Sequence, residues 1–281
     1  MKLVVKKEGE LLDYLYENID MPKKRIKQYL THGSIYVNNN KTTKFNYKLV
    51  PGMNIVIDTD SKNKKTLPFE VLFEDDHIIV VNKPSGLLTI ATNKEKEKTL
   101  YHIVRDYLIS KDKNSRIFIV HRLDKDTSGI VVLAKDEKTK NTLQENWNEY
   151  VDLREYVAVV HGKLKKEEDT IIQYLKETKT NLVYVSKDKD GKEAITNYKV
   201  IGENDDYSLL EIKISTGRKN QIRVAMASIK NPIVGDKKYG IKDHYDRLYL
   251  HANRLRMYYP EIKKSILFET SYPSEFKKIM K

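Results

Sequence analysis

One short stretch of the sequence combines an acid, a permanent cation and small polar residues, and it runs His121-Arg-Leu-Asp-Lys-Asp-Thr-Ser-Gly-Ile130. Runs rich in β-branched residues at 116–120 and 130–134 predict buried strands on either side of it, so we expect a loop fixed at both ends. Such a loop can hold the Asp124 carboxylate rigidly in a cleft, and the Arg122 guanidinium would keep that carboxylate ionised. The pattern favours a catalytic acid.

Three other interpretations of this loop stay open. Asp124, Asp126 and Ser128 lie at alternate positions, as in a calcium-binding loop, but Lys135 stands where that loop needs a bidentate Glu. A hydrolase triad could draw on His121, Asp124 and Ser128, although the sequence has no Gly-x-Ser-x-Gly elbow. The simplest alternative is a polar hairpin turn.

Composition narrows the class of protein. The chain has 281 residues, 40% of them hydrophobic, which is enough for a substantial core divided between a small and a larger domain. The net charge of +12 indicates a polyanionic partner, and RNA or DNA is the first expectation. No apolar run approaches the roughly 20 residues of a membrane-spanning helix. The N-terminus has too short an apolar core for a signal peptide, so we expect a cytoplasmic protein.

Some classes of site are excluded by composition. The sequence contains no Cys, so disulfides, thiolate zinc sites and a cysteine nucleophile are all ruled out. No dinucleotide fingerprint and no cluster typical of a metal site is found, so we expect neither a cofactor nor a metal.

A small α+β module is predicted at the N-terminus. Leucines at helical spacing and a second helix opened by Pro22 are followed by short strands around 34–38 and 53–57. Residues 21–57 contain seven basic residues and no acid, so this region is expected to bind phosphates. The predicted RNA-binding residues lie on the second helix: Lys23, Lys24, Arg25 and Lys27.

The chain is expected to divide into an RNA-binding domain at 1–58, a polar linker at 59–68 and a catalytic domain at 69–281. Within the last, helices are predicted over 100–109, with Thr99 as N-cap, and over 139–150.

Three further segments carry candidate site residues. A Lys-Pro-x-Gly turn at 83–86 follows a predicted strand, and Tyr156 lies on an alternating strand over 153–162. Residues 215–224 lead from a strand into a helix, whose N-terminus favours anions. Arg218 and Gln221 are therefore predicted to hold an RNA phosphate, and Arg223 to approach the catalytic carboxylate. Ordinary strand packing and helix capping are the alternatives for these segments.

Taken together, these segments resemble the motifs of the RluA-type pseudouridine synthases. The resemblance rests on His121-Arg-Leu-Asp124 with Thr-Ser-Gly129, on the turn at Lys83, on the strand of Tyr156, and on Thr-Gly-Arg-x-x-Gln-Ile-Arg-Val over 216–224. It implies an α+β catalytic domain with a mixed, largely antiparallel sheet and flanking helices. It also implies that Asp124 is the catalytic aspartate, that Tyr156 stacks on the uracil and takes part in proton transfer, and that Lys83 belongs to the substrate site.

The match has departures. The family often has His where this chain has Asn220 and Ala225, and it commonly has Lys where this chain has Arg154. Asn220 and Ala225 are expected to affect local hydrogen bonding and substrate choice, whereas Arg154 preserves the positive charge.

The N-terminal module is similar to the S4 RNA-binding domain, through residues 23–33, Val37, Asn38 and Gly52. An S4 domain joined to such a catalytic domain resembles the enzymes that modify large-subunit ribosomal RNA, although relatives act on transfer RNA.

The hypothesis is therefore an RNA pseudouridine synthase, acting as a monomer. The target uridine is flipped out, Arg122 fills the space it leaves, and Arg223 keeps Asp124 ionised and oriented. Two rivals come from other classes: a non-catalytic RNA-binding or ribosome-assembly protein, and a metal-dependent hydrolase at the Asp-rich loop.

Overall fold

The computed structural model describes residues 1–31, 33–58, 66–93 and 95–281, and the chain divides into two compact units, 1–66 and 67–281. Most of the predicted linker, residues 59–65, lies outside this described part. No helix in the described ranges is both long enough and apolar enough to cross a bilayer.

The first unit packs two helices against a small antiparallel sheet of order β1-β6-β3-β4, with a second pair β2-β5. Leu11, Leu15, Ile26 and Leu30 are fully or almost fully buried against the strands, which accounts for the helical spacing of the apolar residues. The elements are β1 (Lys2–Val4), β2 (Gly9–Glu10), α1 (Leu11–Asn18), α2 (Lys23–Thr31), β3 (Ile35–Val37), β4 (Asn40–Thr42), β5 (Lys48–Leu49) and β6 (Asn54–Ile57).

The second unit is built on an eleven-stranded sheet in which nine strands follow the order β13-β12-β14-β15-β11-β16-β10-β8-β7, while β17 pairs with β16 and β9 with β10. Its strands are β7 (Val71–Glu74), β8 (Ile78–Lys83), β9 (Phe118–Ile119), β10 (Ser128–Ala134), β11 (Val151–His161), β12 (Glu168–Glu177), β13 (Val183–Val185), β14 (Lys192–Glu203), β15 (Tyr207–Ile214), β16 (Leu250–Tyr259) and β17 (Lys264–Glu269). All the pairings are antiparallel except that of β10 with β16. The predicted α+β fold class is confirmed.

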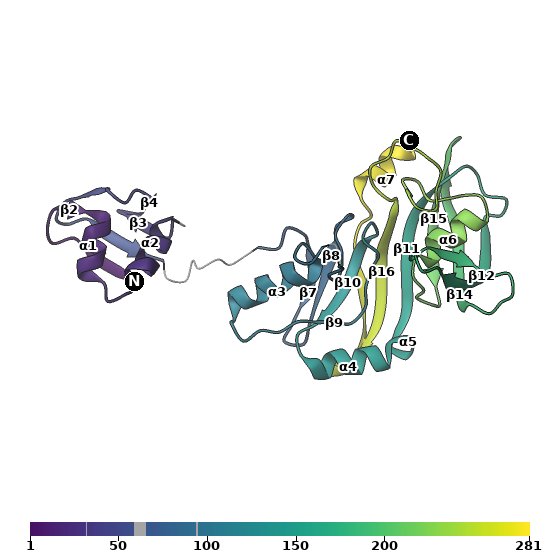
Figure 1. The fold of residues 1–281 in the computed structure, drawn as a ribbon, viewed down its shortest axis with the longest axis horizontal. Helices are drawn as coiled ribbons and strands as arrows, with labels where there is room; N and C mark the ends of the chain where they lie inside the picture. Colours follow the sequence, from purple (N-terminus) through teal and green to yellow (C-terminus); the bar gives the residue numbers. More distant parts are fainter. Residues whose placement is uncertain (32, 59–65, 94) are drawn as a thin grey trace. The chain divides into compact units, whose positions relative to one another are not determined.

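Helices flank this sheet, with α6 lying beside β12 and β14 (Figure 1). They are α3 (Leu100–Lys111), α4 (Glu137–Glu145), α5 (Trp147–Tyr150), α6 (Gln221–Ser228), the 3₁₀ turn η1 (Pro260–Ile262) and α7 (Ser274–Ile279). Thr99 caps α3 as predicted, since its side chain accepts a hydrogen bond from the His102 amide. The helix predicted over 139–150 instead begins at Glu137 and is interrupted at Asn146, whose backbone leaves helical geometry.

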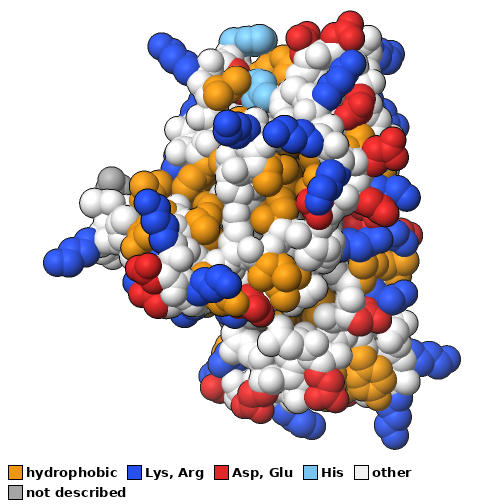
Figure 2. Space-filling view, turned by 90° about the vertical axis from the view of Figure 1, so that its right-hand side faces the viewer, with side chains coloured by type: hydrophobic (Ala, Val, Ile, Leu, Met, Phe, Trp, Pro, Cys, Tyr) orange, Lys and Arg blue, Asp and Glu red, His pale blue; other side chains and the backbone are white. Residues whose placement is uncertain are grey.

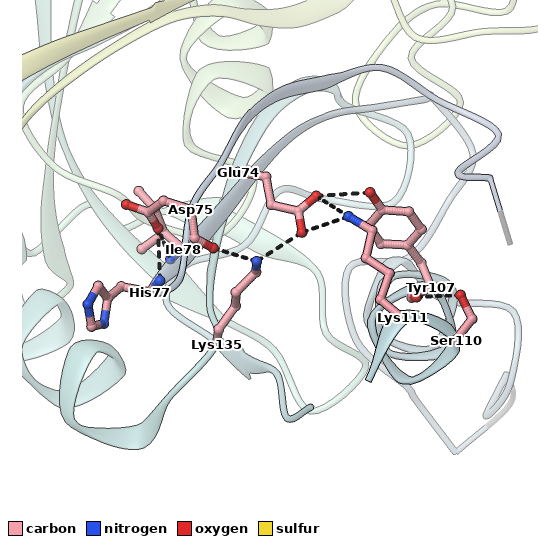
Figure 3. Close-up of polar contacts among 8 residues, drawn as sticks. All are labelled: Glu74, Asp75, His77, Ile78, Tyr107, Ser110, Lys111 and Lys135. Carbon is pink, nitrogen blue, oxygen red and sulfur yellow. Dashed lines mark hydrogen bonds and ion pairs between the residues drawn. The ribbon is translucent and has the colours of Figure 1, made fainter. Parts of the chain in front are cut away.

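A charged network fastens α3 and β10 to the end of β7 (Figure 3). The Glu74 carboxylate accepts hydrogen bonds from Lys135 and Lys111, at 2.9 and 3.0 Å, and from the Tyr107 hydroxyl at 2.9 Å. Burial alone would raise the pKa of Glu74, but these three donors hold it below its usual value. The network therefore stabilises the half of the sheet that carries β10, and β10 begins where the Asp124 loop ends.

Candidate active site

The loop that carries Asp124 lies between β9 and β10. Side chains from elsewhere in the fold form hydrogen bonds with the residues before and after Asp124. The buried Thr89 hydroxyl donates to the Leu123 carbonyl at 2.8 Å and accepts from the Leu123 amide at 3.3 Å. On the other side, the Lys125 carbonyl accepts from the Lys83 ammonium at 3.0 Å. Because both flanking peptides are fixed by specific hydrogen bonds, Asp124 has little freedom to move.

Lys83 makes structural contacts beneath the loop, and its place in the substrate site stays a prediction. Its side chain is fully buried, and its nitrogen donates to the carbonyls of Pro84, Leu87 and Lys125 at 3.1, 2.7 and 3.0 Å. An ammonium group has three donors, so these bonds use all of them. Burial lowers the pKa of Lys83 to about 7, although the charges of Asp126 and Asp124 act in the opposite direction. Lys83 therefore helps to position the loop.

The far end of the loop is anchored to β16 by the parallel pairing of Ser128 with His251 and Gly129 with Ala252. The Ser128 hydroxyl lies 2.8 Å from the His251 Nδ1 and accepts a hydrogen bond from Arg247 at 2.8 Å. Gly129 has a φ of +118°, and a Cβ atom there would stand 2.2 Å from the Ala252 carbonyl oxygen. Glycine is therefore required for the close approach of the two strands.

Sheet register brings Tyr156 to the same place. Tyr156 on β11 pairs with Ala252 on β16, and Ala252 in turn pairs with Gly129 on β10. The register between β11 and β16 shifts by one residue next to Tyr156, and such bulges re-aim side chains near functional sites. Burial raises the pKa of Tyr156 to about 12, so its phenol stays protonated at neutral pH. Tyr156 is thus a neutral ring beside the Asp124 loop.

A hollow of about 150 Å³ brings the predicted residues together. Its lining includes Arg122, Asp124, Tyr156, Arg218, Gln221 and Arg223. The three residues predicted to be catalytic, Asp124, Tyr156 and Arg223, come from a loop, a strand and a helix that are distant in sequence. Their convergence gives a half-buried carboxylate, an aromatic ring and fixed cations around one small space.

Asp124 is half-buried, and burial raises its pKa above the usual range. The charges of Arg223 and Arg122 act in the opposite direction without cancelling this effect. The sequence led us to expect that Arg122 keeps the carboxylate ionised. In the structure the arginines instead limit a rise that burial causes.

Arg223 is held by a partner that sequence analysis did not assign. Its guanidinium donates two hydrogen bonds to the buried Asp236 carboxylate, at 2.8 and 2.6 Å, and a third to the Asn220 side chain at 3.3 Å. Asn220 also donates to the Tyr239 hydroxyl at 3.0 Å. Arg223 therefore acts on Asp124 through its charge from a fixed position, and Asn220, one of the departures from the family pattern, belongs to this support.

The side chain of Gln221 is bound within the protein, and its role in holding phosphate stays a prediction. Its carbonyl oxygen accepts from the Thr216 hydroxyl and the Arg218 amide, and its amide group donates to Ile195 and Thr196. Because the side chain is almost fully buried and its groups are engaged inside the protein, it shapes the turn at the start of α6, and it also lines the hollow. The other departure, Ala225, lies on α6 and is buried in the core.

Arg122 and Arg218 are exposed at the rim of the hollow. In the first unit, the four basic residues predicted to bind RNA, Lys23, Lys24, Arg25 and Lys27, are all exposed on α2.

Comparisons with known proteins agree with this geometry. The family model described as RNA pseudouridylate synthase matches residues 77–228. An uncharacterized RNA pseudouridine synthase of Mycoplasma genitalium is 32% identical, over 92% of this chain and 87% of its own. Ribosomal large subunit pseudouridine synthase D of Salmonella typhimurium is 30% identical, over 90% of this chain and 84% of its own. In structure, human RNA pseudouridylate synthase domain containing 4 matches 76% of this chain and 92% of its own, with a TM-score of 0.63 and 22% identity.

Proposed function

The chain belongs to the RNA pseudouridylate synthase family, and from this premise we propose that it isomerises specific uridines of large-subunit ribosomal RNA, with Asp124 as the catalytic group. The observation that carries the proposal is the meeting of Asp124, Tyr156 and Arg223 around one hollow. Ribosomal RNA is the substrate class because relatives spanning most of the chain, such as the Salmonella protein, are named for the large ribosomal subunit.

The reaction needs a single carboxylate. The bond from the ribose anomeric carbon to N1 of uracil breaks, the uracil turns in place, and the same ribose carbon joins C5; the proton on C5 leaves and N1 gains one, so the product is an isomer. Asp124 serves this sequence by attacking the anomeric carbon or by removing a neighbouring ribose proton. Both routes use the ionised carboxylate, and the Arg223 charge favours that form.

The neighbouring residues supply positioning. Tyr156 stacks on the flipped uracil, and because its phenol is protonated it can donate a proton or a hydrogen bond. Arg122, exposed at the rim, occupies the space that the uridine leaves in the RNA. Arg218 binds a backbone phosphate with its exposed guanidinium.

The first unit acts as an S4-like RNA-binding domain within 1–58. The cluster Lys23, Lys24, Arg25 and Lys27 on one exposed side of α2 supports this role, because clustered cations release counterions from RNA phosphates. The protein is proposed to work in the cytoplasm, where ribosomal RNA is found, and as a monomer.

The test is Asp124→Asn, with Asp126→Asn as the matched control in the same loop. Pseudouridines are mapped at nucleotide resolution in ribosomal RNA from cells without the gene that receive the wild-type or a variant gene. We expect the mark to be restored by the wild type and the control but not by Asp124→Asn, which should still bind RNA. Full activity in Asp124→Asn would remove the assignment. A wild-type protein that binds ribosomal RNA yet leaves no mark would favour a non-catalytic RNA-binding role.

A further inference from the structure

The active-site hollow lies beside a second and larger hollow. The two share Gly217, Arg218 and Lys219 as a common wall. The second has a volume of about 460 Å³ and is lined otherwise by β12, β13 and the start of β14. That size falls within the roughly 300–1,000 Å³ typical of ligand pockets. A chain that enters the first hollow can therefore extend into the second without leaving the protein surface.

The charges in the second hollow favour an anion. Its basic side chains are Lys176, Lys192, Arg218 and Lys219, and its acidic ones are Glu177 and Asp190. Each acid already forms an ion pair, Asp190 with Lys176 and Glu177 with Lys219. Within the described part of the chain, no carboxylate pairs with Lys192 or with Arg218. The surface that carries β12, β14 and α6 also shows many Lys and Arg side chains, with acidic ones between them (Figure 2).

Arg218 is fixed in position before any ligand binds. Its Nε donates to the Glu193 carbonyl at 2.9 Å, and its backbone amide donates to the Gln221 side chain at 3.0 Å. Among the described residues, no hydrogen bond uses the terminal nitrogens of the guanidinium, so these nitrogens are available to a ligand. A cation held in this way loses little conformational entropy when it binds a phosphate.

We propose that the second hollow binds the RNA strand next to the target uridine, with Lys192 and Arg218 on its phosphates. A flipped uridine stays joined to its neighbours, and the active-site hollow is too small for them as well. The neighbouring nucleotide must therefore pass over a wall of that hollow. The wall formed by Gly217, Arg218 and Lys219 leads to the positive charges of Lys192 and Arg218, with which no carboxylate of the described residues pairs. This inference rests on the proposed RNA isomerase function and identifies where the protein reads RNA beyond the target base.

The test compares Lys192→Ala with Lys199→Ala in the full-length protein. Both lysines are exposed on β14, but Lys199 does not line either hollow. The probe is a transcribed fragment of large-subunit ribosomal RNA that holds the mapped uridine, and its pseudouridine formation is followed at several salt concentrations. For Lys192→Ala we expect KM to rise severalfold with kcat unchanged. The slope of log affinity against log salt should fall by about 0.7, the value for one phosphate contact in single-stranded RNA. Lys199→Ala should match the wild type.

A trimmed RNA gives a second readout. The same fragment is shortened to end at the target uridine, once on its 5′ side and once on its 3′ side. The Lys192→Ala defect should disappear with one of the two trimmed RNAs, because that RNA no longer reaches the second hollow. Equal behaviour of the two variants, or a Lys192→Ala defect that persists with both trimmed RNAs, would overturn the inference. If the wild-type protein itself forms no pseudouridine, the proposed function fails instead, so the two failures are distinguishable.

Discussion

The Arg223 guanidinium and the Asp236 carboxylate form two parallel hydrogen bonds, of 2.8 and 2.6 Å, and both side chains are buried. This pair fixes the cation that faces Asp124 from α6. The geometry is the strong, bidentate form of an arginine-carboxylate contact. In the proposed reaction the function of Asp236 is indirect, because Asp236 determines the position of the positive charge of Arg223.

Asp236→Asn is therefore expected to slow catalysis through Arg223 and not through a contact with the substrate. The amide cannot accept both hydrogen bonds, and removing one partner of a buried ion pair costs about 3–5 kcal/mol. We predict a lower free energy of unfolding in urea and a lower single-turnover rate, with RNA affinity close to that of the wild type. Asp236→Glu, which keeps the charge, should recover part of the rate. An unchanged rate in Asp236→Asn would show that Arg223 does not need this partner.

The lowered pKa of Lys83 predicts that the stability of the protein depends on pH. Its pKa is about 7 in the folded protein against 10.5 for a free side chain, so between these values the unfolded chain binds more protons. Stability then rises with pH across that window, because the cost of burying the ammonium is fully present below about pH 7 and is gone near pH 10.5. Urea unfolding at several pH values should show this rise in the wild type and not in Lys83→Met. Parallel curves for the two proteins would contradict the low pKa.

Lys83→Met should also lose activity. It removes three donors from the carbonyls of Pro84, Leu87 and Lys125, and an unpaired buried polar group costs about 1–3 kcal/mol. The loss should appear in kcat more than in KM, because Lys83 helps to position the Asp124 loop. A change confined to KM would instead support the prediction that Lys83 belongs to the substrate site.

Gly129→Ala tests the close approach of β10 and β16. The new methyl group would meet the Ala252 carbonyl oxygen at 2.2 Å, so the strands must separate and shift the adjoining Asp124 loop. Gly86→Ala is the control, because Gly86 has a comparable φ of +81° but open space around its Cβ position. Both variants carry backbone strain of about 1–3 kcal/mol, and Gly129→Ala alone should also lose most of its activity. Equal stability and activity in the two would show that the contact with Ala252 is unimportant.

The sequence was sufficient to predict residues that the structure brings to one hollow, but not the contacts of these residues. Asp124, Tyr156 and Arg223 each stand in a recognisable local pattern, and strand and helix periodicity was enough to place two of them on the right elements. The α+β architecture of the larger domain was expected from the resemblance to the family that these patterns carry. These predictions depend on short-range information, which a single sequence carries well.

The sequence could not show long-range packing. Lys83 was assigned to the substrate site through its place in the family's motif, and its burial depends on three carbonyls that approach only when the 83–87 turn packs on the Asp124 loop. Gln221 stands at a helix N-terminus, where its side chain can bind either a ligand or the protein's own turn. Which of the two it binds depends on the position of β14, whose Ile195 carbonyl accepts a hydrogen bond from it. Asp236 directly follows Gly235 in the sequence, and nothing in its spacing indicates Arg223 as its partner.

Glu74 provides a stability prediction away from the active site. Its carboxylate accepts hydrogen bonds from Lys135, Lys111 and Tyr107, and its pKa lies below 4.5 in the folded protein (Figure 3). The stabilisation is therefore present above pH 4.5 and is lost as pH falls through the lower folded value. Glu74→Gln should reduce the free energy of unfolding by about 1–3 kcal/mol at pH 7, with a smaller difference from the wild type in acid. Glu145→Gln, an exposed change on α4, should cause little loss at either pH. A Glu74→Gln deficit that is the same at pH 7 and at pH 3 would show that the carboxylate charge does not stabilise this end of the sheet.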